Sequence, residues 1–254
     1  VLRENITYIL NTLKTYVDKI ELDKIIVHIF NSKFYLDNKK IENLPIGLFG
    51  DFYSHELSFF LINNNDLKNL HNIFNECNLK ITKIISKNFL ECATLNNDNK
   101  IDTFIKVEIN EIKSNIIFFE NSSLRFIQEF DFGSNLIIRD ISKIISLDID
   151  LVKNILSTEN FFNENFENKL LQTKYFNEKN FRKIKKKLIL DIAKARIQEL
   201  SEIMMLKNVN FYSFLKKKLP IFLLINENSY LSPFEEIFKL SFSDNNFHDT
   251  KFVE

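Results

Sequence analysis

The sequence predicts an α/β protein made of two lobes. Three observations support this prediction. Helix-like and strand-like apolar patterns alternate along the 254 residues, a polar segment at 96–100 divides them, and three strand-like runs follow that segment. A chain of this length can bury the core of one large or two small domains. A globular protein is therefore expected.

The first lobe begins with a helix and continues with strands. Residues 3–20 carry apolar side chains at helical spacing, which indicates an amphipathic helix. Residues 24–30 and 32–36 are apolar and rich in β-branched side chains, and they predict a strand that ends at a polar turn. Residues 55–62 predict the next strand of the same lobe.

A second helix and a third strand complete the predicted first lobe. The helix takes its cap from Asn65 or Asp66 and leads to a strand at 79–85 and a short helix at 88–95. The polar segment that comes next is the expected boundary. We expect both long helices of this lobe to cover one side of its sheet, because each has a single apolar stripe.

The segment LPIGLFG, residues 44–50, predicts a loop of defined shape between two strands of this lobe. It holds Pro45, Gly47 and Gly50. Proline fixes φ, and each glycine can adopt positive φ, so the loop is expected to be exposed at one end of the sheet. The composition favours Asn, Lys, Ile and Phe, which is typical of an AT-rich coding bias, and only three glycines remain in the chain. Those three are therefore informative.

The second lobe starts with strands and continues mainly with helices. The strand-like runs lie at 102–109, 115–119 and 124–130, with a turn at 120–123 between the last two. Apolar residues at helical spacing predict helices at 136–145, 149–156, 184–206 and 234–240. Pro220 precedes a buried strand at 221–225.

Charge and cysteine content exclude several classes of protein. Lys and Arg number 34, equal to Asp and Glu, so no overall field attracts nucleic acid or an anionic membrane. Cys77 and Cys92 suggest neither a disulfide framework nor a zinc site, which favours a reducing, cytoplasmic compartment. The histidines have no ligand spacing, so no metal site is expected; they are His28, His55, His71 and His248.

Several short motifs, in a fixed order, resemble one family. The segment from Asn43 to Gly50 is close to an N-P-x-G-[LM]-x-G loop, with one inserted residue. Further matches lie at Asn69-Leu70, Cys77-Asn78-Leu79, Val107, Ile109, Ile116, Leu124-Arg125, Gly133, Asn135, Asp140-Ile141, Arg196 and Glu199. By these motifs the chain is similar to the middle and end of FtsA, the actin-like cell-division protein.

The resemblance implies an actin-like architecture of ribonuclease H-like lobes. Residues 1–79 would form a small inserted α+β subdomain of the SHS2 type, and residues 80–100 a connecting segment of the first actin-like lobe. Residues 101–254 would form the second actin-like lobe, with a helical subdomain at about 139–186. In the family a strand and a first phosphate loop come before the part matched here, and a membrane-targeting helix comes after it.

The family's nucleotide loops are degenerate in this sequence. Its D-x-G-G-G-T loop falls on Glu108-Ile109-Asn110-Glu111-Ile112-Lys113, and its T-G-G loop on Ile225-Asn226-Glu227. Glycine is needed there because backbone N–H groups must approach the phosphate oxygens closely. Residues 152–156 likewise keep neither polar group of the helix that meets the nucleoside. We therefore expect a pseudo-ATPase scaffold with no cofactor, although Lys113 offers one cation.

A basic run predicts a surface for an acidic partner. It consists of Arg182, Lys183, Lys185, Lys186 and Lys187. The alternative for this run is the solvated face of a helix, and the aromatic residues before it fit either the core or a peptide groove. In the family, the helical subdomain recognises the acidic C-terminal tail of FtsZ, so FtsZ is the implied partner of this surface.

The resemblance implies a cell-division adaptor rather than an enzyme. Such an adaptor self-associates into filaments at the septum and links the FtsZ polymer of the Z ring to the inner membrane. It lies on the cytoplasmic face, attached only through a C-terminal helix that lies outside these residues, and no nucleic acid is implied. Two alternatives remain: an ATP-dependent actin-like switch or ATPase, which intact glycine loops would mark, and an unrelated α/β protein-binding module.

Overall fold

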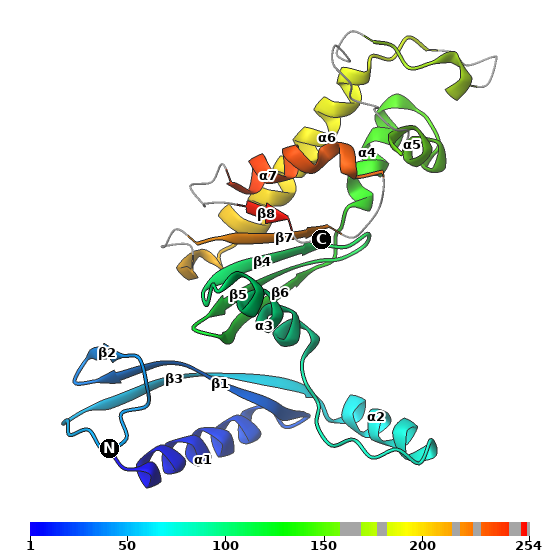
Figure 1. The fold of residues 1–254 in the computed structure, drawn as a ribbon. Helices are drawn as coiled ribbons and strands as arrows, with labels where there is room; N and C mark the ends of the chain where they lie inside the picture. The colour runs from blue at the N-terminus through cyan, green and yellow to red at the C-terminus, as the bar shows by residue number, and fades with distance from the viewer. Residues whose placement is uncertain (158–168, 177–181, 215–218, 226–229, 244–249, 253–254) are drawn as a thin grey trace. The chain divides into compact units, whose positions relative to one another are not determined.

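The computed structural model describes residues 1–157, 169–176, 182–214, 219–225, 230–243 and 250–252. The chain forms two compact units. Unit 1 contains residues 1–103 together with 119–126, and unit 2 contains 104–118 and 127–254. The three-stranded sheet belongs to unit 1 and the five-stranded sheet to unit 2, apart from the strand ends at 119–126 (Figure 1).

Unit 1 is built on an antiparallel sheet with the strand order β2-β1-β3. Its strands are β1 (Lys24–Leu36), β2 (Lys39–Ile41) and β3 (Tyr53–Asn63), and its helices are α1 (Arg3–Ile20), α2 (Asn64–Glu76) and α3 (Lys87–Asn99). The predicted first helix and the strand at 55–62 are confirmed. The two predicted strand runs at 24–36 form one strand, β1, which contains two irregularities opposite β3.

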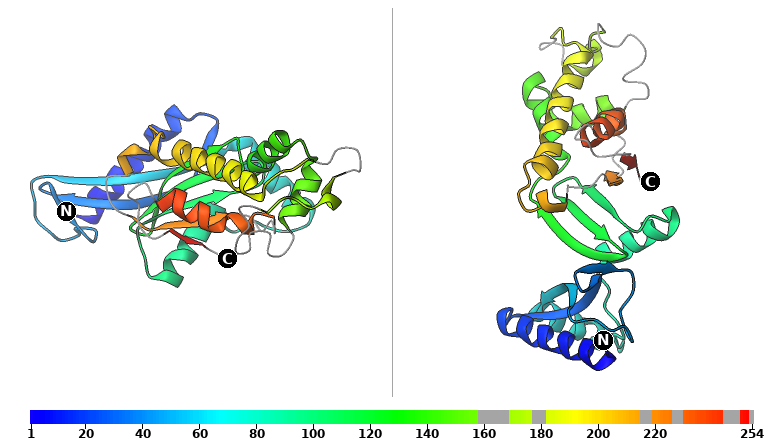
Figure 2. Two further views of the ribbon diagram at one scale, coloured as in Figure 1. Left: turned by 90° about the horizontal axis from the view of Figure 1, so that it is seen from above. Right: turned by 90° about the vertical axis from the view of Figure 1, so that its left-hand side faces the viewer.

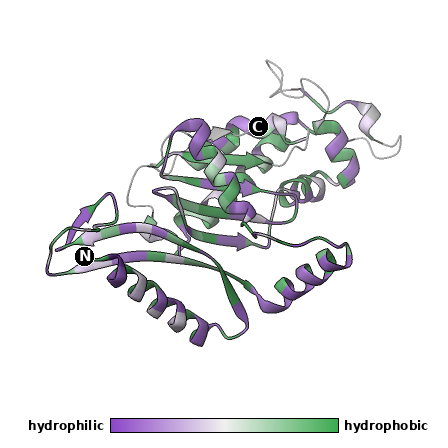
Figure 3. Cartoon of the chain, turned by 60° about the horizontal axis from the view of Figure 1, so that its bottom comes forward, coloured by the Kyte–Doolittle hydropathy of each residue, from purple (hydrophilic) through white to green (hydrophobic). Residues whose placement is uncertain are grey.

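The two long helices of unit 1 bury little. Helix α1 contacts β1 and helix α2 contacts β3, as the apolar stripes predict. Only Ile6 of α1 is buried, and α2 has no buried residue. Helix α1 is drawn largely in hydrophilic colours, whereas the strands of the five-stranded sheet are largely hydrophobic (Figure 3). The sheet of unit 1 is therefore only half-covered.

Three predictions for this lobe are wrong. Residues 79–85 form no strand and pair with no strand among the described residues. The cap of α2 is Asn63 rather than Asn65 or Asp66, and its side chain makes no capping bond. The polar segment 96–99 is the end of α3, which stops at Lys100 in the left-handed region (φ 54°). Polar composition misled the prediction there, because asparagine and aspartate also occur on an exposed helix face.

By contacts, unit 1 runs through residue 103, so it includes both residues 1–79 and the segment 80–100, which the sequence assigned to two different parts of the protein. Helix α3 groups with unit 1, and so does the end of the hairpin formed by β5 and β6. Phe89 of α3 packs against Phe30 of β1, with ring centroids 4.7 Å apart and the ring planes tilted by 39°. Tertiary contacts of this kind are invisible in a linear pattern of apolar residues.

Unit 2 is built on a five-stranded sheet with the order β6-β5-β4-β7-β8. Its strands are β4 (Phe104–Ile109), β5 (Ser114–Glu120), β6 (Ser123–Phe130), β7 (Ile221–Ile225) and β8 (Thr250–Phe252). Strands β4 and β7 are parallel, with Ile105 opposite Ile221 and Ile109 opposite Ile225. Strand β8, which the sequence did not predict, pairs with β7 in parallel. The turn between β5 and β6 is confirmed.

The helices of unit 2 pack on one another beside this sheet. They are α4 (Asn135–Ile145), α5 (Ile149–Leu156), α6 (Lys186–Ser201), a π-helical segment (Glu202–Leu206) and α7 (Glu235–Ser243), with 3-10 turns at Thr173–Tyr175, Tyr212–Phe214 and Ser232–Phe234. Helix α6 contacts α4 and α7, and α7 contacts β7 and β8 (Figure 2). The apolar core lies under these helices and includes fully buried Phe104, Phe222, Phe234 and Phe238. Among the described helices, none combines the length and apolarity that crossing a bilayer requires.

Candidate functional site

The turn between β4 and β5 occupies the place predicted for a phosphate loop. It is a tight four-residue turn in which the backbone N–H of Asn110 donates to the carbonyl oxygen of Lys113 (2.9 Å). Ile112 is exposed at its tip. The Nζ of Lys113 lies 3.9 Å from Glu129 and 3.7 Å from Asp131, so carboxylates share the one cation that was considered for phosphate binding.

The N-terminus of helix α4 points its N–H groups at this turn. Ser134 donates its backbone N–H to the carbonyl oxygen of Asn110 (2.9 Å), and Asn135 donates to that of Glu111 (3.0 Å). Free N–H groups at a helix N-terminus form a ready anion site. Here protein carbonyl oxygens accept these two N–H bonds, so they are not available to a phosphate.

Gly133 permits this close approach. A Cβ at this position would meet the carbonyl oxygen of Asn110 and lie 2.6 Å from the carbonyl carbon of Glu111. Both are backbone atoms, which cannot move without breaking the turn. The glycine that matches the family motif is therefore required for packing the turn against α4.

The Glu111 carboxylate pairs with a lysine from another element. Its Oε1 lies 2.9 Å from Nζ of Lys153 on α5, and the same Nζ lies 5.1 Å from the ring centroid of Tyr230. The hydrogen bond to Glu111 raises the pKa of Lys153, and burial raises the pKa of the Tyr230 hydroxyl. The turn, α5 and the segment before α7 thus meet at one ion pair. No local pattern in the sequence predicts this pair, because its residues are far apart along the chain.

Glu108 is also engaged by the protein. It and Lys106 are buried side by side on β4, with Nζ 3.2 Å from Oε2, and the side-chain amide of Asn115 donates to the same carboxylate oxygen (3.2 Å). A buried carboxylate needs such partners because desolvation of an unpaired charge is costly. The acidic residue that opens the predicted loop is therefore neutralised inside the sheet.

The second predicted loop is described only in part. Ile225 ends β7 opposite Ile109, so the two loop positions follow neighbouring parallel strands at the same edge of the sheet. Asn226 and Glu227 lie outside the described residues. Among the described residues, no group of His, Cys, Asp and Glu could hold a metal ion.

The basic run lies at the start of α6, and a lysine from another segment, Lys169, lies beside it. Arg182, Lys183, Lys185 and Lys187 are exposed, and the run also includes half-buried Lys186. Lys186 donates its backbone N–H to Lys169 (2.9 Å), and burial together with the charge of Lys169 lowers the pKa of Lys186. Lys169 therefore belongs to this basic surface, although the sequence did not show it.

The aromatic residues near the basic run divide into two groups. Phe176 is buried and Tyr175 is half-buried, which favours the core interpretation for these two. The others, Phe161, Phe162, Phe166 and Phe181, lie outside the described residues, as do parts of the helical subdomain predicted at 139–186.

The predicted loop at 44–50 is irregular, as expected. Gly47 has φ +85°, a conformation that favours glycine, whereas Gly50 permits a close approach: a Cβ there would lie 2.6 Å from the side chain of Leu36. Pro45 is buried, and Phe49 is almost fully exposed. Glycine is therefore favoured at positions 47 and 50 for different structural reasons.

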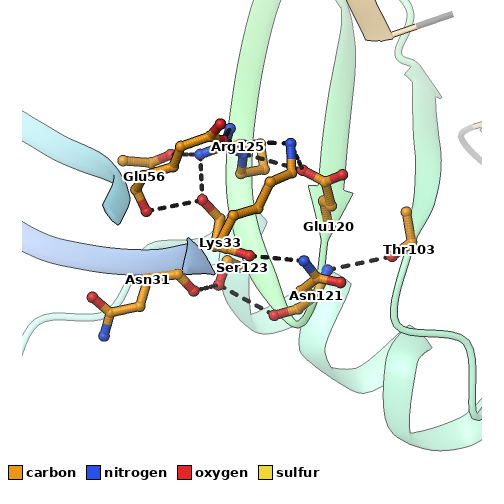
Figure 4. A network of polar contacts seen from close by, with 10 residues as sticks. Asn31, Lys33, Glu56, Thr103, Glu120, Asn121, Ser123 and Arg125 are labelled. Atoms are coloured by element: carbon orange, nitrogen blue, oxygen red, sulfur yellow. Dashed lines mark hydrogen bonds and ion pairs between the residues drawn. The ribbon is translucent and has the colours of Figure 1, made fainter. Parts of the chain in front are cut away.

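A charged cluster in unit 1 was not predicted. Arg125, at the end of the hairpin, lies 2.7 Å from Glu56 of β3 and 3.5 Å from Glu120, and Lys33 of β1 lies 3.1 Å from Glu120 and 3.4 Å from Glu56 (Figure 4). Arg125 also donates to the hydroxyl groups of Ser32 and Ser58. Two cations and two carboxylates thus balance each other.

Neutral hydrogen bonds surround this charged cluster. The hydroxyl of Ser123 donates to the carbonyl oxygen of Asn31, and the side-chain amide of Asn121 donates to that of Ser32, both at 2.7 Å (Figure 4). Burial acts to lower the pKa of Lys33, but its bonds to Glu120 and Glu56 outweigh burial, and the pKa is raised. Lys33 is therefore held in its charged form.

Comparison with solved structures finds proteins of similar fold. No known protein family and no curated protein matches the sequence. Among solved structures, the chain is similar to the PilM–PilN type IV pilus biogenesis complex at 8% identity, with 100% of this chain and 64% of that chain covered and a TM-score of 0.58. It is also similar to MreB 5 of Spiroplasma citri bound to AMPPNP (13% identity, 75% and 60% covered, TM-score 0.42). EutJ, the ethanolamine utilization protein of Carboxydothermus hydrogenoformans, is similar at 12% identity (63% and 47% covered, TM-score 0.40).

The whole-length match shows the fold. The chain has the actin-like, ribonuclease H-like α/β fold, as the sequence predicted. It spans 64% of the chain in the pilus complex and 47% of EutJ.

Proposed function

We propose that the chain is part of an actin-like adaptor of the FtsA type, which links FtsZ to the inner membrane at the division site and works without bound ATP. The proposal that the protein works without ATP rests on the N-terminus of helix α4, whose first N–H groups already have partners within the protein. The N–H groups of Ser134 and Asn135 are bonded to backbone carbonyl oxygens, and Glu111 is held by Lys153. The actin-like fold and the motif resemblance support the adaptor part.

The free energy that is lost with the phosphate-binding hydrogen bonds is large enough to abolish ATP binding. Each charge-assisted hydrogen bond that a cradle cannot make costs about 1.5–3 kcal/mol. Three such bonds amount to about three to six decades of affinity, because 1.4 kcal/mol corresponds to tenfold. The carboxylate of Glu111 adds repulsion toward a phosphate. In this proposal the protein is a scaffold and not an enzyme.

Thermal unfolding with Mg-ATP tests the nucleotide-independent part. We expect no ATP-specific rise in melting temperature at millimolar Mg-ATP, whereas a ligand at 100 times its Kd stabilises a fold by about 2.7 kcal/mol. MreB 5, which has been solved with AMPPNP, is the positive control for the assay. An ATP-specific rise in the melting temperature of the natural chain would reject the proposal.

The basic surface supports FtsZ as the partner. Its described members are Lys169, Arg182, Lys183, Lys185, Lys186 and Lys187. A surface of this charge fits the acidic tail that the resemblance implies, through charge-assisted hydrogen bonds and electrostatic steering. Self-association into filaments and a cytoplasmic position at the inner membrane complete the proposal, with attachment through a helix outside these residues.

Calorimetric titration with the cognate FtsZ tail peptide tests this partner. We expect Lys183→Glu with Lys185→Glu to weaken binding roughly tenfold, since each exposed ion pair contributes about 0.2–1 kcal/mol and reversal adds repulsion. The matched control is Lys14→Glu with Lys68→Glu, which changes the net charge equally on exposed helix faces of unit 1. Absence of heat at millimolar peptide, or equal loss in the control, would contradict the assignment.

A further inference from the structure

Helix α5 of unit 2 is too short to be stable by itself. It has eight residues, Ile149–Leu156, whereas an isolated helix of fewer than about 12–15 residues is marginal in water. Its N-cap residue, Asp148, makes no side-chain capping bond. Helix α5 lies against α4 (Figure 1), and its buried residues are Val152, Ile155 and Leu156. The position of α5 is therefore decided by tertiary contacts.

The turn between α4 and α5 holds the two helices to each other. Helix α4 ends at Ser146, which adopts a φ of 54°. The backbone N–H of Leu147 donates to the carbonyl oxygen of Ser142 (3.2 Å), and the hydroxyl of Ser142 donates to the carbonyl oxygen of Leu147 (2.6 Å). These bonds join α5 to α4, but they do not reach the strands of the sheet. A contact between α5 and the sheet has to come from another side chain.

Lys153 of α5 makes that contact. Its Nζ lies 2.9 Å from Oε1 of Glu111 in the turn between β4 and β5, and 5.1 Å from the ring centroid of Tyr230 in the segment before α7. The side chain of Lys153 is 30% exposed, and Tyr230 is buried. A cation over an aromatic face is attracted more strongly where water is partly excluded. One ammonium group therefore joins three segments that are distant along the chain.

Two of these segments are places where the sequence predicted degenerate nucleotide contacts. Glu111 falls on the phosphate loop, and residues 152–156 fall on the helix that would meet the nucleoside. A ligand bound to both would hold them together through its own hydrogen bonds and charges. In this chain a protein cation makes the equivalent connection, with a carboxylate on one side and an aromatic ring on the other.

We propose that Lys153 is a built-in substitute for a nucleotide, a positioning residue that holds α5 to the turn at Glu111 and to the segment at Tyr230. Unit 2 then keeps one internal arrangement without a ligand. The inference rests on the proposed function in one respect, namely that no nucleotide binds between these segments. Because Lys153 and Glu111 are both partly exposed, salt should weaken the contact.

Amide hydrogen exchange without nucleotide tests this role, because it measures local opening of a single element. Lys153→Met keeps an unbranched apolar side chain and removes the charge. We expect the amides of α5 to exchange about tenfold faster in this variant, which corresponds to about 1.4 kcal/mol, while those of β4 are unchanged. The matched control is Lys143→Met on α4, which removes an exposed lysine that has no ion pair among the described residues.

Rescue and salt dependence separate the ion pair from simple packing. Lys153→Arg keeps the charge and should retain most of the protection of α5. Glu111→Lys combined with Lys153→Glu restores an ion pair but loses the cation over the ring of Tyr230, so we expect partial protection. Raising the salt concentration from about 0.05 to about 0.5 M should accelerate exchange of α5 in the natural chain and leave Lys153→Met unchanged.

Three results would overturn the inference. They are unchanged exchange of α5 in Lys153→Met, an equal acceleration in Lys143→Met, and an equal acceleration in Lys153→Arg. All three are measured without nucleotide, so they leave the proposed function standing. Failure of the proposed function has a different signature: added Mg-ATP would slow the exchange of α5 in the natural chain, and a nucleotide rather than Lys153 would then hold this helix.

Discussion

The two sheets of the molecule bury their strands to different degrees. Every residue of β4 in unit 2 is buried, including the pair formed by Lys106 and Glu108, whereas almost all of β3 in unit 1 is only half-buried. Helices α4, α6 and α7 have several buried apolar residues, but α1 and α2 together bury only Ile6. Unit 2 is therefore stabilised by an apolar core, and unit 1 depends more on polar contacts.

The polar contacts of unit 1 are concentrated in the charged cluster around Arg125. Its members come from β1, β3 and both strands of the hairpin, β5 and β6, so one cluster ties four strands together (Figure 4). A partly buried cluster of this kind is not an efficient stabiliser, because desolvation of Arg125 and Glu120 offsets much of the attraction. It does specify geometry, since each charge requires its partner. We infer that the two units will respond differently to apolar and to charged substitutions.

The largest expected effect is a core truncation in unit 2. Phe222 is 1% exposed and packs edge-on against Phe104, with centroids 5.0 Å apart. Phe222→Ala should lower the free energy of unfolding by about 3–5 kcal/mol through lost burial and a cavity. Phe60→Ala on half-buried β3 should lower it by roughly half as much. Urea unfolding, combined with amide hydrogen exchange measured separately for each unit, gives the free energy lost in each variant. Equal losses in the two variants would contradict the proposed difference between the sheets.

Unit 1 should be more sensitive to the loss of a charge from the cluster around Arg125 than to the loss of an apolar side chain. Arg125→Met leaves Glu120, whose side chain is 8% exposed, with Lys33 as its one cationic partner among the described residues, and we expect a loss of about 3 kcal/mol in unit 1. Lys24→Met is the control, because its pair with Glu21 is solvent-exposed and worth about 0–1 kcal/mol. Denaturant unfolding of unit 1 gives both values. A loss in Arg125→Met no larger than in the control would mean that the cluster contributes nothing.

Replacing glycine by alanine tests close packing in each unit. Gly133→Ala should lower the free energy of unfolding of unit 2 by about 1–3 kcal/mol, since the new Cβ meets backbone atoms of the turn at Glu111. Gly50→Ala should cost less, because its Cβ would meet side-chain atoms of Leu36 and Asp37, which can move. Thermal melting curves of the two variants compare these losses of stability. A larger loss at Gly50 would show that the turn at α4 is adaptable.

The smallest expected effect is a pH dependence of unit 1. Both ring nitrogens of His55 are buried without a hydrogen-bond partner beside Phe34 and Tyr53, and burial lowers the pKa of His55. The unfolded chain, with a pKa of about 6.5, therefore binds the proton first as pH falls. Stability should be full above that pH and decrease below it, down to the lowered folded pKa.

His55→Phe is the matched variant for this pH effect. Between pH 8 and pH 5, about the range in which histidine titrates, it should show a shallower decrease in melting temperature than the natural chain. His28, whose pKa is lowered by burial and by Lys83, accounts for a remaining part. An unchanged slope in His55→Phe would exclude His55 as the titrating group.

The sequence by itself determined the elements whose signals are local. Apolar spacing placed α1, α4 and α5 within a residue or two, and the turn residues placed the β5–β6 hairpin, where Asn121 and Ser122 adopt positive φ. The order of short motifs pointed to the actin-like fold before any contact was known. These features follow from backbone preference and from the period of the side chains, which need no distant partner.

Only the tertiary structure decided which residues meet. A strand was predicted at 79–85 from composition, but pairing requires a neighbour, and no described residue supplies one. The degenerate loop was visible in the sequence, whereas the ion pair of Glu111 with Lys153 and the need for Gly133 were not. The cluster of Lys33, Glu56 and Arg125 was hidden for the same reason. Its members are separated along the chain, and only folding brings their charges within Coulombic reach.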